Sequence, residues 1–212
     1  FVTGSNSSLL SGELATYLTG RYYTIEVFPL SFSEIVAHQK KQNRPVADIH
    51  SSFIDYLKVG GLPGRFMFTE ERTAKNYIYD LYQSILLKDI VQRYRIRDVD
   101  LLQRFMLYLS NNAAQIFSAD TVTKYLRSEN RKLSRETIYN YIEAAQNAYL
   151  IYGVPQYDIR GKALMKTSEK HFIADQGLRS LFFDNEADIG QVLENIVFLE
   201  LKRRGYDLSI GR

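Results

Sequence analysis

The stretch SADTVTKYLRSENRKLSRETIYNYIEAAQNAY, residues 118–149, holds two helical patterns that a short polar link separates. Each pattern opens with a serine that can cap a helix, Ser118 or Ser134, and each has an acid in its first turn. The apolar residues of the second pattern share one helical face: Ile138, Ile142, Ala145 and Tyr149. The stretch therefore predicts two consecutive helices joined by a turn.

The residues on either side extend this motif. A helical pattern covers residues 98–115, and residues 150–157 read as a strand that a basic turn, 158–162, follows. Residues 164–166 and 171–174 are candidate return strands. Because helix, turn, helix and β-hairpin is the element order of a winged helix, we predict this fold for the middle of the chain.

Towards the N-terminus the pattern differs. Residues 1–6 read as the end of a buried strand followed by a polar turn, residues 8–18 as a short helix and residues 22–28 as a strand. Together they make an α/β unit whose sheet partners we expect upstream of Phe1. Ser31 and Glu34 form a capping box at the start of a helix. The expected elements at the other positions are helices at 31–39, 46–59 and 69–94, a short helix at 175–183, a long helix at 191–204 and a strand starting at 206. The fold class predicted is mainly α (α+β).

The composition excludes several classes of protein. Of the 212 residues, 45% are hydrophobic and none is cysteine, which fits a folded protein without disulfides, thiolate metal sites or a cysteine nucleophile. No apolar run is long enough to cross a bilayer, so we expect no membrane partner and a cytoplasmic location. The net charge of +3 is only mildly basic, and it indicates nucleic acid only where the charge is clustered.

Several blocks together resemble a known family. They are TGSNSSLL (3–10), LTGRY (18–22), GGLP (60–63), LLKDI (86–90), FIADQGL (172–178) and LENIVFLEL (193–201). In this order they are similar to a bacterial and archaeal group of P-loop ATPases of the AAA superfamily. The resemblance implies the C-terminal end of the ATPase core at 1–30, a helical lid at 31–97, a winged-helix region at 98–185 and the start of a nuclease-like α/β domain at 186–212.

The same resemblance implies ATP and Mg²⁺ as cofactors of the full-length protein. This sequence contains no G-x-x-x-x-G-K-[ST] loop, so we expect no cofactor for the 212 residues alone. Ser5 and Asn6 stand where the family has the residues that sense the γ-phosphate, although they equally suit a simple turn. Arg21 stands where a finger arginine reaches a neighbouring subunit's nucleotide in a homo-oligomer, or it is a surface arginine that pairs with an acid such as Glu26.

A cluster of basic and polar side chains makes the winged-helix region a candidate for duplex DNA. The start of the second helix supplies potential base and phosphate contacts, and the wing supplies further positive charge. The candidate DNA-binding residues are Arg131, Lys132, Arg135, Tyr139, Asn140, Arg160, Lys162 and Lys166. Because many winged helices dock proteins instead, that alternative stays open.

The last helical segment offers two acids, Glu194 and Glu200. The resemblance implies that a glutamate in this helix can belong to a metal site of the nuclease-like domain, while Lys202, Arg203 and Arg204 nearby equally suit ordinary helix-surface ion pairs, so we expect no metal. The three histidines are scattered without metal-ligand spacing, so we expect no zinc site. The leading interpretation is a piece of an ATP-dependent switch protein acting on DNA or a DNA-bound partner. The alternative is a winged-helix regulator without nucleotide chemistry, and a metal-dependent nuclease is a third reading.

Overall fold

The computed structural model describes residues 3–7, 23–41, 48–128, 131, 133–158, 163–183 and 188–211. Helices dominate these residues, and a small sheet of three strands completes the fold, so the mainly α class predicted from the sequence is confirmed. The helices before the sheet are α3 (Phe32–Lys41), α4 (Ile49–Val59), η1 (Pro63–Met67), α5 (Glu71–Ser84), η2 (Ile85–Gln92), α6 (Val99–Asn111), α7 (Ala119–Ser128) and α8 (Arg135–Asn147). The remaining elements are β1 (Ile151–Asp158), β2 (Ala163–Ile173), α9 (Gln176–Arg179), α10 (Ile189–Arg203) and β3 (Ile210–Gly211).

Side-chain caps explain where several helices begin. Ser31 and Glu34 form the expected capping box: the backbone N–H of Ser31 donates to Glu34 Oε2 at 2.8 Å, and the N–H of Glu34 donates to Ser31 Oγ at 3.3 Å. The N–H and the hydroxyl of Ser31 both donate to Glu34 Oε2 at 2.8 Å, and these two hydrogen bonds lower the pKa of Glu34. Ser134 accepts the N–H of Thr137 at 3.1 Å and starts α8 in the same way.

A π-helix continues the long helix expected at residues 69–94. α5 ends at Ser84, and the backbone runs without a break into η2, whose hydrogen bonds follow the wider π pattern. Leu86 and Ile90 of η2 have no exposed surface. This segment therefore anchors the end of the long helix in the core.

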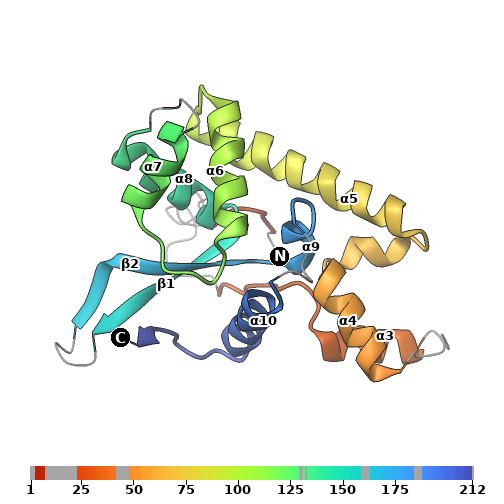
Figure 1. Ribbon diagram of the computed structural model, residues 1–212. Coiled ribbons are helices and arrows are strands. Elements are labelled where there is room, and N and C mark those ends of the chain that lie inside the picture. Colours follow the sequence, from red (N-terminus) through yellow and green to blue (C-terminus); the bar gives the residue numbers. More distant parts are fainter. Residues whose placement is uncertain are drawn as a thin grey trace.

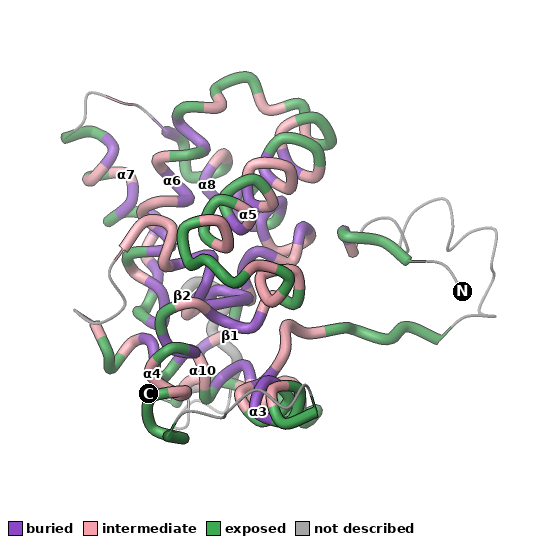
Figure 2. Tube along the Cα trace, turned by 90° about the vertical axis from the view of Figure 1, so that its right-hand side faces the viewer, coloured by how far each residue is buried: buried purple, intermediate pink, exposed green. Residues whose placement is uncertain are grey.

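The main core lies where η2, α6, α7 and α8 meet. Its fully buried side chains include Leu86, Ile90, Leu102, Phe105, Val122, Leu126 and Ile138. Each such side chain contributes about 1.5–3 kcal/mol through burial. In Figure 2 the buried residues gather around these helices and the strands. In Figure 1, α6, α7 and α8 lie on one side of the hairpin and α10 on the other.

The sheet has the strand order β2-β1-β3. β1 and β2 pair antiparallel from Ile151↔Ile173 to Asp158↔Ala163, with a register shift at Pro155/Gln156. The two separate return strands expected from the sequence are therefore one strand of 11 residues. The strand expected to start at residue 206 is confined to Ile210–Gly211, and it pairs parallel with β1 at Gln156↔Ile210. Ile116, before α7, makes an isolated bridge to Lys170.

The prediction of a strand at residues 22–28 was wrong for residues 23–28, which the structure describes. Residues 23–30 form no regular strand, because no described segment offers them a backbone ladder. Side chains hold this segment instead: Tyr152 Oη donates to Glu26 at 3.0 Å, and Arg203 donates to the Pro29 carbonyl at 2.8 Å. Tyr23, Ile25 and Val27 are 89%, 70% and 86% exposed. The extended sequence is thus attached to α10 and β1 without joining the sheet.

The α10 helix covers the second face of the hairpin. Phe198 stacks on Phe172 of β2 with ring centroids 4.1 Å apart, and Asn195 exchanges hydrogen bonds with both backbone groups of Ile173 at 2.8 and 2.9 Å. α10 therefore belongs to the same packing unit as the sheet, while the domain boundaries drawn from the sequence stay predictions.

Candidate functional site

The helices α7 and α8 are followed directly by the β1–β2 hairpin, which is the element order expected for the middle of the chain. One face of α8 is buried in the core, and its residues are Ile138, Tyr141, Ile142, Ala144 and Ala145. The opposite face of its first turns is exposed, with Tyr139 46% exposed and Asn140 also exposed. The first half of α8 is therefore open to a partner, as a recognition helix needs to be.

Both described arginines of the predicted DNA interface already have acidic partners. Arg131 Nη2 lies 2.7 Å from Asp100 of α6, and Arg135 Nη2 lies 2.6 Å from Asp120 of α7. All four side chains are at least 43% exposed, so solvent screens both pairs and each contributes little to stability. A phosphate would have to replace Asp100 or Asp120 as the partner of its arginine.

Several predicted site residues lie outside the described residues: Arg21, Lys132, Arg160 and Lys162. Lys166 lies on β2, but its side chain is not among those described. Of the proposed interface, the structure therefore describes the side chains of Arg131, Arg135, Tyr139 and Asn140. The DNA-contacting role of every member stays a prediction.

The turn at residues 3–7 packs against the helical core. Ser5 Oγ donates to Asp89 Oδ2 at 3.1 Å, and Asn6 Nδ2 donates to the Asp89 carbonyl at 3.4 Å. Asn6 is only 1% exposed. The next residue, Ser7, reaches the last residue of α8: its N–H donates to the Asn147 carbonyl at 2.9 Å and its Oγ to Asn147 Oδ1 at 2.8 Å. The predicted sensor turn thus touches η2 and the end of α8 together.

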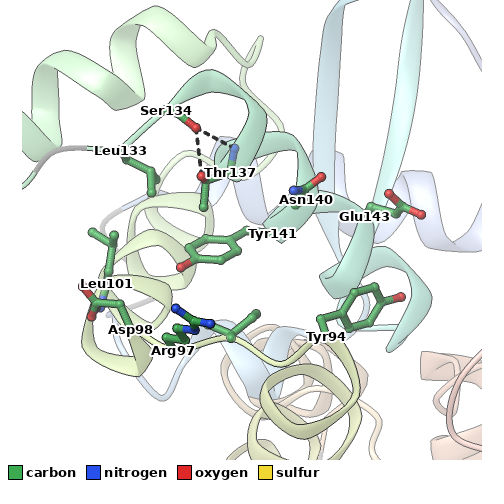
Figure 3. Close-up of a pocket in the computed structure, with 11 residues that line it drawn as sticks. Tyr94, Arg97, Asp98, Leu101, Leu133, Ser134, Thr137, Asn140, Tyr141 and Glu143 are labelled. Carbon is green, nitrogen blue, oxygen red and sulfur yellow. Dashed lines mark hydrogen bonds between the residues drawn. The ribbon is translucent and has the colours of Figure 1, made fainter.

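A cavity of about 470 Å³ lies beside the first half of α8. One wall is α8, with Thr137, Asn140, Tyr141 and Glu143, and the other is the link between η2 and α6. Figure 3 shows the Arg97 guanidinium between the two walls, below the ring of Tyr141. Burial raises the pKa of Tyr141, so its phenol stays neutral at ordinary pH. The remaining lining residues are Tyr94, Ile96, Asp98, Leu101, Leu133 and Ser134.

Asp175, which no sequence pattern marks as a site residue, lies at a buried junction between two loops. Its Oδ2 accepts the N–H of Gly61 at 2.6 Å, and its Oδ1 accepts the N–H of Gly177 at 2.8 Å. Burial raises the pKa of Asp175 to about 6, against the two hydrogen bonds and Arg65, which lower it. Gly61 belongs to the family block GGLP (60–63), and Asp175 and Gly177 belong to the family block FIADQGL (172–178). The glycines in both blocks were the one sequence feature that could have indicated a close backbone contact between them.

The two acids of α10 lie in ion pairs. Glu200 lies 2.8 Å from Arg203 and 2.8 Å from Arg204, and the hydrogen bonds from these arginines lower its pKa. Glu194 lies 2.6 Å from Lys170 of β2. Within the described part of the chain, no three His, Cys, Asp or Glu side chains gather as a metal-binding group. Nor does any described helix combine the length and apolarity that a membrane span needs.

Comparison with known proteins adds two family matches. A model described as "Domain of unknown function (DUF8612)" matches residues 50–188, and a model described as "AAA domain" matches residues 1–36. The second match agrees with the coarse resemblance to AAA proteins, and nothing in the comparisons supports a nuclease-like domain. No solved structure matches the chain.

Two relatives match all or nearly all of the chain. An uncharacterized protein of Haemophilus influenzae is 40% identical over 212 residues, which are 100% of this chain and 52% of the relative. An uncharacterized protein of Methanocaldococcus jannaschii is 32% identical over 212 residues, covering 97% of this chain and 47% of the relative. The chain thus spans about half the length of these relatives. Since residues 50–188 make up more than half of it, the chain belongs to the family described as domain of unknown function DUF8612.

Proposed function

We propose that this chain is part of an ATP-dependent switch protein in which helices α7 and α8 act on DNA or a DNA-bound partner. The AAA-domain match at residues 1–36 supports the nucleotide half of this proposal. ATP and Mg²⁺ would bind through residues beyond these 212, because the sequence has no G-x-x-x-x-G-K-[ST] loop. A homo-oligomer formed through the ATPase core would place Arg21 against a neighbour's nucleotide.

One observation carries the proposal: Ser7, inside the AAA-matching segment, makes two hydrogen bonds to Asn147, the last residue of α8. Ser5 and Asn6, the proposed γ-phosphate sensors, precede Ser7 directly. A shift of this turn on ATP binding would therefore act on the helix that offers Tyr139 and Asn140 to a partner. Coupling of this kind requires that the two states of the turn differ in their contacts with α8.

The DNA half rests on the exposed start of α8 and on the basic residues around it. Arg131 and Arg135 can exchange their acidic partners for phosphates, because these ion pairs are exposed and individually weak. Asn140 presents an amide, which can pair with adenine in the major groove. Lys162 and Lys166 would add positive charge from the hairpin.

The test measures the affinity of the full-length protein for a labelled duplex by fluorescence anisotropy, with and without a non-hydrolysable ATP analogue. We expect the analogue to change the affinity about fivefold or more. Asn147→Ala should shrink this difference. Asn111→Ala, at the exposed C-terminal end of α6, is the matched control and should keep it.

Two outcomes contradict the proposal. Absence of ATP turnover by the full-length protein removes the nucleotide half. Absence of duplex binding at low salt removes the DNA half.

A specific observation favours a second candidate, docking of a protein. Glu136 and Glu143 lie on the exposed side of α8, and Arg131 and Arg135 are already paired with acids. This mixed charge suits a protein surface, since acids near a DNA backbone are repelled. If α8 docks a protein, the chain belongs to a regulator that binds a partner protein, and the titration with the DNA duplex would show no binding.

A further inference from the structure

The link between η2 and α6 places an arginine in the cavity beside α8. Arg95 adopts a left-handed backbone with φ of 52°, which is uncommon for a residue other than glycine. The Ile96 N–H donates to the Val91 carbonyl at 3.0 Å, and Asp98 caps α6 by accepting the Leu101 N–H at 2.9 Å. Arg97 stands between these two fixed points, so the strained turn presents its side chain to α8 (Figure 3).

The walls of the cavity combine aromatic rings with polar groups. Tyr94 is fixed by Asn147 Nδ2, which donates to its hydroxyl at 2.7 Å, and Tyr141 is 5% exposed. Leu101 and Leu133 supply an apolar surface. Among the described residues, neither Arg97 nor Asn140 has a hydrogen-bond or ion-pair partner. The cavity therefore offers flat surfaces together with one cation and one amide available to a ligand.

We propose that this cavity takes one unpaired nucleotide of a DNA strand. A base can stack against Tyr94 or the Arg97 guanidinium, and the Asn140 amide offers the donor and acceptor that a base edge requires. Arg97 can alternatively pair with the adjoining phosphate. A volume of about 470 Å³ falls within the range of small-molecule sites. The proposal rests on the DNA contact of α8 and specifies its substrate: DNA with an unpaired nucleotide rather than a perfect duplex.

Position supports DNA over a free nucleotide. Ser134, Thr137 and Asn140 of the cavity belong to the same first turns of α8 that the DNA proposal uses. A strand lying along α8 would hold its neighbouring phosphates outside the cavity, close to Arg131 and Arg135. A nucleotide that leaves the stack would then enter the cavity beside the helix, and an already unpaired one does so without the cost of breaking a base pair.

The experiment compares two labelled duplexes of the same sequence, one fully paired and one with a single unpaired adenosine, each titrated with the full-length protein at low salt. We expect the unpaired site to bind about tenfold more tightly. Arg97→Ala should bring the two affinities together, whereas Arg72→Ala, an exposed arginine on α5, should preserve the difference. With 2-aminopurine at the unpaired position, stacking should quench its fluorescence in the wild type and less in Arg97→Ala.

The outcomes separate this inference from the function on which it rests. If both duplexes bind with equal affinity, the proposal that the cavity takes an unpaired nucleotide is wrong, and the proposal that α8 contacts DNA is unaffected. Binding to neither duplex overturns both proposals. If Arg97→Ala unfolds, judged by circular dichroism, Asn140→Ala takes its place with the same expected loss of preference.

Discussion

The carboxylate of Asp175 accepts a hydrogen bond of 2.6 Å from the backbone N–H of Gly61, although the two residues are 114 positions apart. The Gly61 carbonyl in turn accepts the N–H of Leu30 at 2.8 Å. Through Gly61, Asp175 therefore connects Leu30 of the AAA-matching segment, the loop after α4 and the start of α9. Stability should depend strongly on this one buried carboxylate.

Asp175 should make stability fall as pH rises through the acidic range. Burial raises its folded pKa to about 6 from the ordinary 3.8, so the folded protein holds this proton more tightly than the unfolded chain does. Stability from this group is present in full below pH about 4 and is lost as pH rises to about 6, by roughly 3 kcal/mol. Asp175→Asn removes this contribution, and its amide cannot accept from both Gly61 and Gly177. Urea unfolding at a series of pH values should find the variant more destabilised relative to wild type at pH about 4 than at pH about 7.

The matched control for this titration is Asp80→Asn, at an exposed position on α5. It should show a constant difference from wild type across the same pH range. If Asp175→Asn behaves like this control, the buried junction contributes nothing to the pH dependence.

Gly60→Ala should destabilise the protein by more than about 1 kcal/mol. Gly60 has φ of 69°, and a Cβ there would overlap with the carboxylate of Asp175. Gly190→Ala in α10 is the control, because a Cβ there meets nothing and alanine favours a helix. Thermal unfolding followed by circular dichroism should show a lower Tm for the first variant and an unchanged or higher Tm for the second. Equal Tm values for Gly60→Ala and wild type would show that the loop relaxes around the added methyl.

Arg21→Ala in the full-length protein should lower ATP turnover while leaving ATP affinity nearly intact. A finger arginine acts on charge that develops in the transition state, so its loss appears in kcat. The measurement pairs steady-state hydrolysis with equilibrium binding of a labelled nucleotide. Mixing this variant with a variant of the phosphate loop should restore part of the activity if the arginine acts across subunits. If ATP turnover of the Arg21→Ala variant equals that of the wild type, Arg21 is not a finger arginine but an ordinary surface residue.

Charge reversal of Lys162 and Lys166 should weaken binding to every duplex alike. Contacts to phosphates carry no sequence information, and each one lost also lowers the dependence of affinity on salt. Fluorescence anisotropy across a salt series, with two unrelated duplex sequences, measures both effects. Lys124→Glu on α7, a single reversal at a site outside the proposed interface, is the control for each single reversal, Lys162→Glu and Lys166→Glu. If the control weakens binding as much as each of these, the attraction reflects overall charge and the hairpin has no special part.

The helices could be predicted from the sequence because their signals are local. Ser31, Asp98 and Ser134 each cap the helix that follows, and apolar periodicity marks the buried faces of α6 and α8. The β1–β2 hairpin followed for the same reason, since its two strands adjoin in sequence. The π-helical turns of η2 escaped prediction, because apolar residues at helical spacing fit an α-helix equally well.

Contacts between distant segments could not be predicted in this way. The parallel pairing of Gln156 with Ile210 joins residues that no local pattern relates. The partners of Arg131 and Arg135 are acids on other helices, Asp100 and Asp120, and Asp100 is shared with Arg104. The sequence pattern showed the basic residues but gave no sign of these ion pairs. Arg97 was missed as a site residue because only the strained turn at Arg95 places it beside α8.

The π-helical segment Ile85–Gln92 also bears on how the gene can vary in length. A π-helix closes its hydrogen bonds from i to i+5, so it holds a residue more than an α-helix would need over the same span. Loss of one codon within this segment would convert it to ordinary α-helix and leave α5 and α6 facing as they do now. Loss of one codon within α6 would rotate the residues that follow it and turn Phe105 or Leu109 out of the core. Single-residue deletions in natural variants should therefore be tolerated between Ile85 and Gln92 and be absent from α6.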